Sequence, residues 1–128
     1  MRKVVHFEIP SDDLARAQSF YSSVFGWQLQ TMPMPGGDYV IAMTTPVDDS
    51  TQLPTEPGAI NGGLMQRDEA TPTPVITIDV DSIDDALKEI EARGGAVITP
   101  STAIPGMGAF AYFKDSEGNV MGLWETAS

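Results

Sequence analysis

The chain has 128 residues, of which 41% are hydrophobic, so it is long enough for one compact domain with its own core and too short for two ordinary domains. Its 7 Lys and Arg against 18 Asp and Glu give a net charge of −11, which would repel the phosphates of nucleic acids and of anionic membranes and makes both poor partners. It has no cysteine for disulfides or thiolate metal sites and no apolar run of the roughly 18 residues that span a membrane, and we therefore expect a cytoplasmic protein without a signal peptide.

The first half of the chain has the pattern of a β-α-β-β-β module. Val4 to Ile9 is rich in β-forming residues and predicts a strand that ends at Pro10. From Ser11 or Asp12 onward, apolar residues recur at three- and four-residue steps, which predicts an amphipathic helix that stops at Gly26. Three more strands are expected, over Trp27 to Met32, Asp38 to Thr44 and Ile60 to Gln66.

Aromatic residues are concentrated near the end of this helix. Tyr21 and Phe25 share the helical spacing of the apolar residues before them, so we expect Phe20, Tyr21 and Phe25 to lie in the core rather than to stack on a ligand. The segment from 45 to 59 is a long loop, and loops over about 12 residues in compact domains often act as lids. We therefore expect it near the rim of a binding cavity.

A polar linker, residues 67 to 74, leads into a second module with the same pattern. Val75 to Val80 predicts a strand, and Ser82 with Asp85 fits the capping box at the start of a helix that should stop at Gly94-Gly95. The apolar face of this helix is formed by Ile83, Ala86, Leu87 and Ile90. Three further strands are expected, over Ala96 to Thr99, Ala109 to Lys114 and Asn119 to Trp124.

The two patterns indicate an internal duplication. Asp13 precedes Gly26 by 13 residues, and Asp81 precedes Gly94 by 13 residues, an offset of 68. We expect residues 1–128 to form a single domain of the α+β class, with modules 1–66 and 75–128 joined by the linker 67–74. Eight strands with only two helices do not alternate as a doubly wound sheet requires. If the two sheets curl toward each other, the first and last strands of each module line one cavity.

Glycine pairs in the chain match no nucleotide-binding motif. Gly36-Gly37, Gly62-Gly63 and Gly106-x-Gly108 neither form a P-loop nor open a helix as a dinucleotide fingerprint does. We interpret them as turns and strand bends.

Motifs in both modules carry a family resemblance. They are His6-Phe-Glu-Ile-Pro, Asp13-Leu14-x-Arg16-Ala17, Phe20-Tyr21, Phe25-Gly26-Trp27, Gly94-Gly95 and Asp115-Ser-Glu-Gly-Asn-Val-Met-Gly-Leu-Trp124. In combination they resemble the vicinal oxygen chelate superfamily, which includes glyoxalase I, extradiol dioxygenases, fosfomycin resistance enzymes and bleomycin resistance proteins. The resemblance covers nearly the whole chain. It implies two tandem β-α-β-β-β modules in a cup-shaped mixed sheet, the glyoxalase/bleomycin resistance fold, often in a homodimer and, in the enzymes, with a divalent metal on the floor of the cup.

The metal-dependent relatives have four metal ligands, one on each of four strands. Only one of these four positions holds a matching residue in this sequence. His6 stands at the first-strand ligand position, whereas its counterpart in the second module is Pro74 or Val75 and the terminal-strand position holds Gly122. The fourth counterpart falls on residues 61–66, which contain no His or acidic residue. A catalytic Fe, Ni or Zn site needs about three protein ligands. We therefore expect no metal and no cofactor.

Strand alternation selects the candidate site residues. His6 and Glu8 fall on one face of the first strand, where they would serve as a general acid/base pair or as polar anchors for a ligand. Trp124 shares the phase of Gly122, so an aromatic wall would lie beside a gap suited to a planar or apolar ligand. The same reasoning adds Asn61, Met65, Thr77 and Tyr112 to the predicted ligand-binding set.

These observations predict a small-molecule-binding protein that needs no metal, holds an aromatic or hydrophobic ligand in the sheet cavity and forms a homodimer. Bleomycin resistance proteins are the metal-free precedent that the resemblance offers, since they bind a cationic drug in dimer crevices. The alternative is a glyoxalase-like lyase or isomerase in which His6 and Glu8 transfer protons, with a metal site that is incomplete or completed by a partner chain. A structural or regulatory interaction module is the third class left open.

Overall fold

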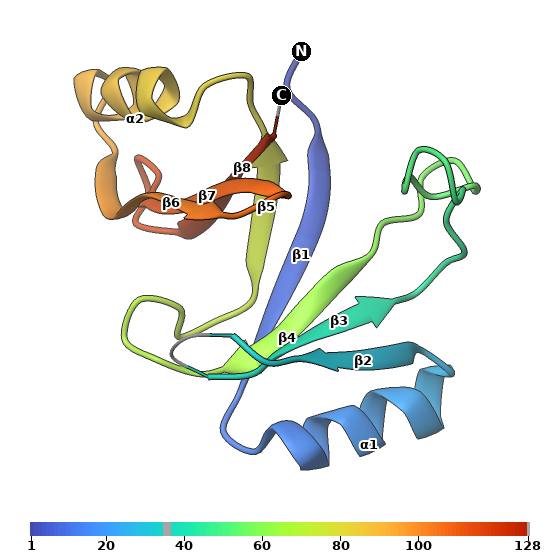
Figure 1. The fold of residues 1–128 in the computed structure, drawn as a ribbon. Helices are drawn as coiled ribbons and strands as arrows, with labels where there is room; N and C mark the ends of the chain where they lie inside the picture. Colours follow the sequence, from blue (N-terminus) through green and yellow to red (C-terminus); the bar gives the residue numbers. More distant parts are fainter. Residues whose placement is uncertain (35–36, 128) are drawn as a thin grey trace. The chain divides into compact units, whose positions relative to one another are not determined.

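The structure is a computed structural model that describes residues 1–34 and 37–127. Two helices and eight strands follow one another as two β-α-β-β-β series (Figure 1), which confirms the predicted α+β class. The chain divides into two compact units. The N-terminal unit contains residues 6–68 and 72–74, and the C-terminal unit contains residues 1–5, 69–71 and those from 75 onward. Among the described residues, neither helix is long and apolar enough to cross a membrane.

The N-terminal unit has a four-stranded sheet in the order β2-β3-β4-β1. Its elements are β1 (Val4–Ser11), α1 (Leu14–Phe25), β2 (Gln28–Met32), β3 (Tyr39–Met43) and β4 (Gly62–Gln66), and the first two residues of β1 belong to the C-terminal unit. Strand β1 pairs with β4 in parallel, whereas the other pairs are antiparallel. The helix begins later than predicted because Asp13 is its N-cap, accepting a hydrogen bond from the Arg16 N–H at 3.0 Å, while Ser11 still belongs to β1. Of the predicted turn at Gly36-Gly37, Gly36 lies outside the described residues.

The aromatic residues of α1 are not core residues, contrary to the prediction. The core of this unit is formed by Val40, Ala42 and Leu64, all fully buried, and α1 contributes no buried side chain to it. Phe20 is 52% exposed and Phe25 60% exposed. The rings pack on one another and on Trp27 at the end of the helix; the Tyr21 and Trp27 rings stack with centroids 4.7 Å apart. The spacing predicts an apolar helix face correctly, but spacing cannot tell whether another element covers it.

The loop over 45–59 is folded back on itself. An isolated β-bridge joins Val47 to Pro54, and the Asp48 N–H donates to the Leu53 carbonyl at 2.8 Å. The Asp48 carboxylate accepts hydrogen bonds from the backbone of Ser50 and Thr51 at 2.9 and 3.0 Å, which forms a tight turn at the tip.

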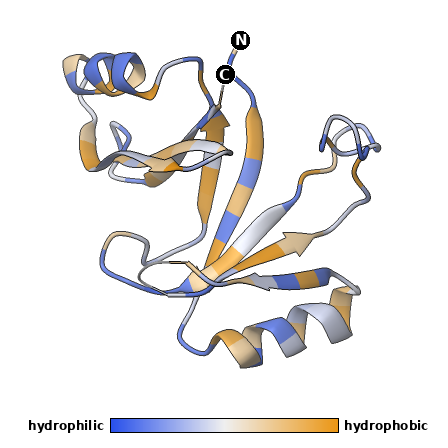
Figure 2. Ribbon diagram, viewed as in Figure 1, coloured by the Kyte–Doolittle hydropathy of each residue, from blue (hydrophilic) through white to orange (hydrophobic). Residues whose placement is uncertain are grey.

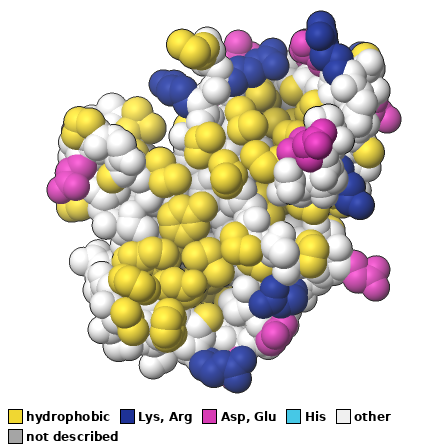
Figure 3. All heavy atoms as spheres, turned by 180° about the vertical axis from the view of Figure 1, so that it is seen from behind, with side chains coloured by type: hydrophobic (Ala, Val, Ile, Leu, Met, Phe, Trp, Pro, Cys, Tyr) yellow, Lys and Arg dark blue, Asp and Glu magenta, His cyan; other side chains and the backbone are white. Residues whose placement is uncertain are grey.

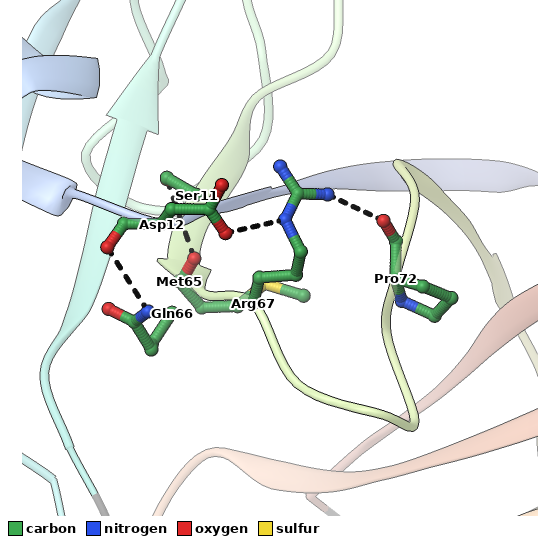
Figure 4. Close-up of polar contacts among 6 residues, drawn as sticks. All are labelled: Ser11, Asp12, Met65, Gln66, Arg67 and Pro72. Atoms are coloured by element: carbon green, nitrogen blue, oxygen red, sulfur yellow. Dashed lines mark hydrogen bonds and ion pairs between the residues drawn. The ribbon is translucent and has the colours of Figure 1, made fainter.

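The start of the predicted linker is tied to the N-terminal unit (Figure 4). Arg67 donates from Nε to the Asp12 carboxylate at 2.8 Å and from Nη1 to the Pro72 carbonyl at 2.5 Å. Its backbone N–H donates to the Ser11 carbonyl at 2.9 Å, and the neighbouring Gln66 amide donates to the Asp12 carbonyl at 3.3 Å. One arginine therefore joins the end of β1, the end of β4 and the loop that follows.

The C-terminal unit repeats the arrangement in the order β5-β8-β7-β6. Its elements are β5 (Val75–Asp79), α2 (Ile83–Ala92), β6 (Ala96–Ile104), β7 (Gly108–Lys114) and β8 (Val120–Thr126). Strand β5 pairs with β8 in parallel, and α2 packs on the sheet through a cluster that includes Val80, Ile83, Leu87, Phe113 and Leu123.

Two local features of the C-terminal unit test the predicted element ends. Ser82 caps α2 as predicted, since its hydroxyl accepts from the Asp85 N–H at 3.2 Å. Strand β6 runs five residues past the predicted end at Thr99 and passes through Pro100. This is possible because β6 is an edge strand and its register shifts around that proline, so no ladder hydrogen bond is needed there.

Candidate functional site

Strand β1 alternates between two chemistries. Figure 2 shows hydrophobic and hydrophilic residues following one another along it, and the register places Phe7 opposite Gly62 and Glu8 opposite Gly63 on β4. Strand partners point to the same side of a sheet, so Leu64 with its core neighbours lies on the opposite side from Glu8. The Phe7 ring, on the Leu64 side, contacts Trp27, which in turn stacks on Tyr21 of α1. The polar residues of β1 therefore lie on the sheet face that α1 does not cover.

On that face His6, Tyr39 and Glu8 form one hydrogen-bonded chain. The Tyr39 hydroxyl donates to Glu8 Oε2 at 2.8 Å and lies 2.8 Å from His6 Nε2. Because the hydroxyl has a single proton and gives it to Glu8, we assign the proton of the neutral imidazole to Nε2, which donates to the hydroxyl oxygen. The Glu8 side chain is buried, with the residue only 8% exposed.

The environment keeps His6 neutral. Burial lowers the pKa of His6, and the nearby Glu8 carboxylate opposes this only in part. With a pKa below its usual 6.5, the imidazole is mostly uncharged at pH 7. Within residues 1–34 and 37–127 its Nδ1 has no hydrogen-bond partner, so this atom is available to accept a hydrogen bond or a proton.

A glycine lets Tyr39 reach this position. A Cβ atom at Gly63 would overlap the Tyr39 ring and hydroxyl, and one at Gly62 would overlap the Phe7 ring on the other face. Both glycines lie within β4, inside the strand predicted over Ile60 to Gln66. They are needed for close side-chain packing on the two faces of the strand.

Tyr39 was not predicted as a site residue. Its register partner on β4 is Met65, a predicted ligand-binding residue, so Tyr39 and Met65 share a face. The signal in the sequence was its position two residues before Ile41 and four before Met43, in the phase of the predicted cavity face. Alternation predicts the face of a residue but not its partner, so the contact of Tyr39 with β1 could not be predicted from the sequence.

Asn61 serves the backbone of its own unit. Its side-chain oxygen accepts from the N–H groups of Thr44 and Thr45 at 2.7 and 3.0 Å, and its amide donates to the Thr45 carbonyl at 3.2 Å. These bonds fix the chain as it leaves β3 and use the groups that were predicted to bind a ligand.

The remaining predicted residues lie in the C-terminal unit. In register, Thr77 lies opposite Gly122, which lies opposite Tyr112. A Cβ at Gly122 would lie 2.6 Å from the Thr77 hydroxyl, so Thr77 occupies the gap expected beside Trp124. The indole N–H of Trp124 donates to the Thr126 hydroxyl at 3.1 Å. The structure thus groups the predicted residues into one set per unit.

The donor set does not match the metal sites of the resemblance. In the part of the chain that the structure describes, no three His, Cys, Asp or Glu side chains are grouped to hold a metal ion. His6 and Glu8 both contact the Tyr39 hydroxyl. One imidazole and one carboxylate fall short of the about three protein ligands of a catalytic site.

Comparisons with known proteins agree on the fold. A family model described as "Bleomycin resistance protein-like N-terminal" matches residues 3–45. The chain is 32% identical over 117 residues to a "Glyoxylase-like domain-containing protein" of Didymella fabae, covering 88% of this chain and 84% of that protein. It is 30% identical over 120 residues to the "Putative glyoxylase CFP32" of Mycobacterium tuberculosis, covering 92% of this chain but only 43% of that longer protein. The solved structure of methylmalonyl-CoA epimerase from Mycobacterium tuberculosis superposes with a TM-score of 0.66 at 16% identity, over 98% of this chain and 88% of that one. At this identity the likeness concerns the fold alone.

Proposed function

The chain belongs to the vicinal oxygen chelate superfamily and has the glyoxalase/bleomycin resistance fold, and on that premise we propose that it binds a small organic molecule at the His6–Tyr39–Glu8 chain without a metal of its own. The observation that carries the proposal is this hydrogen-bonded chain on a sheet face left uncovered by α1. Buried polar groups are costly unless paired, and a ligand would use those that the protein leaves available.

The side chains around His6, Tyr39 and Glu8 indicate the ligand class. Ile41 is paired with Gly63 and Met65 with Tyr39, so apolar side chains flank the polar ones. Flexible methionine side chains fit varied apolar bodies. The His6 Nδ1 atom accepts a hydrogen bond, and the net charge of −11 attracts cations. We therefore propose an aromatic or hydrophobic ligand that carries a hydroxyl or amine.

The same residues support the proposal that the site needs no metal. The set offers one imidazole, and a 2-His-1-carboxylate triad needs two. Elemental analysis of protein purified without added metal tests this point, together with the unfolding temperature measured with Ni, Zn, Mn or Fe. We expect no stoichiometric metal and no saturable shift; a large shift that His6→Ala abolishes would contradict the proposal.

Ligand binding is tested with a panel of aromatic amines and phenols added to the same thermal assay. A ligand of this site should raise the unfolding temperature of the native protein and bind about tenfold or more weakly to Tyr39→Phe, because Tyr39 positions His6 and Glu8. Tyr21→Phe removes the same hydroxyl from α1 and is the matched control. Equal binding to both variants would move the ligand away from this site.

A second candidate function is proton transfer by a glyoxalase-like lyase or isomerase. The observation that favours it is the neutral His6 with an available Nδ1, linked through Tyr39 to a carboxylate. Such a group takes a proton from a carbon next to a carbonyl. We would incubate methylmalonyl-CoA, or the hemithioacetal of methylglyoxal, in D2O and follow deuterium uptake by NMR. Uptake that is lost in His6→Gln would support this function, and uptake equal to the blank would exclude both tested reactions.

We propose that a second copy of the chain covers the exposed face of α1. Phe20, Val24 and Phe25 are all more than half exposed there, and the only charged residue of the helix is Arg16. Figure 3 shows hydrophobic side chains gathered on the lower part of one face of the molecule, where α1 and β2 lie. Copies with a charge of −11 repel each other, and a face without carboxylates is where they approach at least cost. Light scattering should give a dimer that Phe25→Ser dissociates and the exposed Ser19→Ala does not; a monomeric parent protein would contradict the proposal.

A further inference from the structure

A cleft opens between α2 and the sheet of the C-terminal unit. Its volume is about 470 Å³, within the range of about 300–1,000 Å³ that is usual for small-molecule sites. The apolar lining comes from the helix and from three strands and includes Ile78, Val80, Ile90, Phe113 and Leu123. Val80, Phe113 and Leu123 also belong to the core cluster beneath α2. In the upper part of Figure 3, hydrophobic side chains are surrounded by basic and acidic side chains.

Two arginines stand at this cleft with incompletely used donors. Arg2 and Arg93 both line it, and both approach the Glu89 carboxylate, at 4.0 and 3.6 Å. These distances are ion-pair distances and are longer than a good N–H···O bond of about 2.7–3.2 Å. Two guanidinium groups thus share one carboxylate, which leaves several of their N–H donors for another acceptor.

The other acidic group of the cleft is committed elsewhere. The Asp115 carboxylate accepts hydrogen bonds from the N–H groups of Glu117 and Asn119, each at 2.9 Å, and from the Asn119 amide at 3.1 Å. The hydrogen bonds from Asn119, followed by that from Glu117, lower the pKa of Asp115, so it stays ionised within its own turn. Arg2 is held nearby because the carbonyl of the next residue, Lys3, accepts from the Asp79 N–H at 2.8 Å.

We propose that this cleft is a second ligand site, which binds a small organic carboxylate with an aryl or branched apolar body. The carboxylate would lie between Arg2 and Arg93, and the apolar body would lie against Phe113 and Ile90. Arginine is suited to this because its planar fork binds a carboxylate in a bidentate manner. Acidic residues far from the cleft oppose the binding of a carboxylate only weakly, since physiological salt screens charges beyond about 8 Å.

The site is independent of the proposed function. All its lining residues lie in the C-terminal unit, whereas His6, Tyr39 and Glu8 lie in the N-terminal unit. Its failure would leave the first proposal standing, and the reverse is also true.

Isothermal titration with phenylacetate tests the proposal, with phenylacetamide as the uncharged analogue. We expect saturable binding of phenylacetate, weaker binding of the amide and weaker binding at high salt. Arg93→Gln should weaken phenylacetate binding about tenfold or more, since a hydrogen-bonded charge pair is lost. The Arg93 side chain is 79% exposed, so this variant should fold normally.

Two further variants on α2 should affect phenylacetate binding differently from Arg93→Gln. Glu89→Gln should tighten phenylacetate binding several-fold because it releases both guanidinium groups. Lys88→Gln removes the same charge as Arg93→Gln from an exposed position that does not line the cleft, and it should leave the affinity unchanged. The proposal is overturned if phenylacetate does not bind saturably, if Arg93→Gln and Lys88→Gln bind it equally, or if Tyr39→Phe rather than Arg93→Gln abolishes binding.

Discussion

In the N-terminal unit, Glu8 on β1 lies opposite Gly63 on β4; in the C-terminal unit, Thr77 on β5 lies opposite Gly122 on β8. Two residues further along β4 and β8, Met65 lies opposite Tyr39 and Trp124 lies opposite Phe110, so Tyr39 and Phe110 have equivalent places in the two units. The two units therefore repeat one strand arrangement but not its side chains. The first carries a hydrogen-bonded chain of imidazole, phenol and carboxylate, whereas the second has an apolar ring where the phenol would be. A duplicated backbone thus fixes where a site residue stands and leaves its chemistry free to differ.

The two helices differ in how deeply they are buried. Helix α1 has no buried side chain and exposes its aromatic residues, whereas α2 buries Ile83, Ala86 and Leu87 in its unit. The unit with the polar chain thus has an exposed helix face, and the unit with the better packed helix has the arginine-lined cleft.

The largest expected effect comes from the two cores. Leu64 and Ile83 are fully buried, one in each unit, and truncation of either to alanine should lower the free energy of unfolding by about 2–5 kcal/mol. Each unit contains one tryptophan, Trp27 or Trp124, so fluorescence during urea unfolding reports on each unit separately in Trp→Phe backgrounds. Coincident transitions would mean that the units unfold together. If Leu64→Ala moved only the Trp27 transition, the units would be independent.

The glycines opposite the site residues should come next. Gly63→Ala forces a methyl group into the Tyr39 ring and should cost about 1–3 kcal/mol, whereas Gly122→Ala meets a Thr77 hydroxyl that can rotate and should cost less. Urea unfolding measures both. As a control, Tyr39→Val should remove most of the cost of Gly63→Ala. If the cost persists in that background, the ring is not what requires a glycine there.

A third prediction concerns pH. Because the folded pKa of His6 is lowered, the unfolded chain takes up a proton first as the pH falls below about 6.5, so stability should decrease from there down to the folded pKa. His6 is the only histidine, and its ring proton signals give the folded pKa directly by NMR. The slope in this window should disappear in His6→Gln. A folded pKa above 6.5 would contradict the burial argument.

The smallest effect is expected at the Arg67–Asp12 ion pair. Both side chains are substantially exposed, so a double-mutant cycle of Arg67→Ala and Asp12→Ala should give a coupling of about 0.2–1 kcal/mol. Arg67→Lys keeps the charge but loses the fork that also reaches the Pro72 carbonyl, and separates the two contributions. A coupling well above this range would show that the pair does more than an exposed ion pair does.

Much of the fold could be predicted from local patterns. The capping residues Asp13 and Ser82 and the alternation of β1 are determined by neighbours within a few positions, so these features were predicted to within one or two residues. The end of β6 was not, because a proline stops a strand only where a ladder bond is required, and that depends on the neighbouring strand. The site was predicted in part for the same reason: alternation placed His6 and Glu8 together but could not supply Tyr39 from another strand.

The duplication, the fold class and the family could be inferred without a structure, because periodicity, caps and motifs are local features of the chain. Which surfaces are covered and which side chains are in contact became clear only from the folded structure. It exposed Phe20 and Phe25, committed Asn61 to the backbone and joined His6 to Glu8 through Tyr39. The reason is that burial and hydrogen-bond partners depend on residues distant in sequence, here more than 30 positions apart for His6 and Tyr39, and no local pattern encodes that distance.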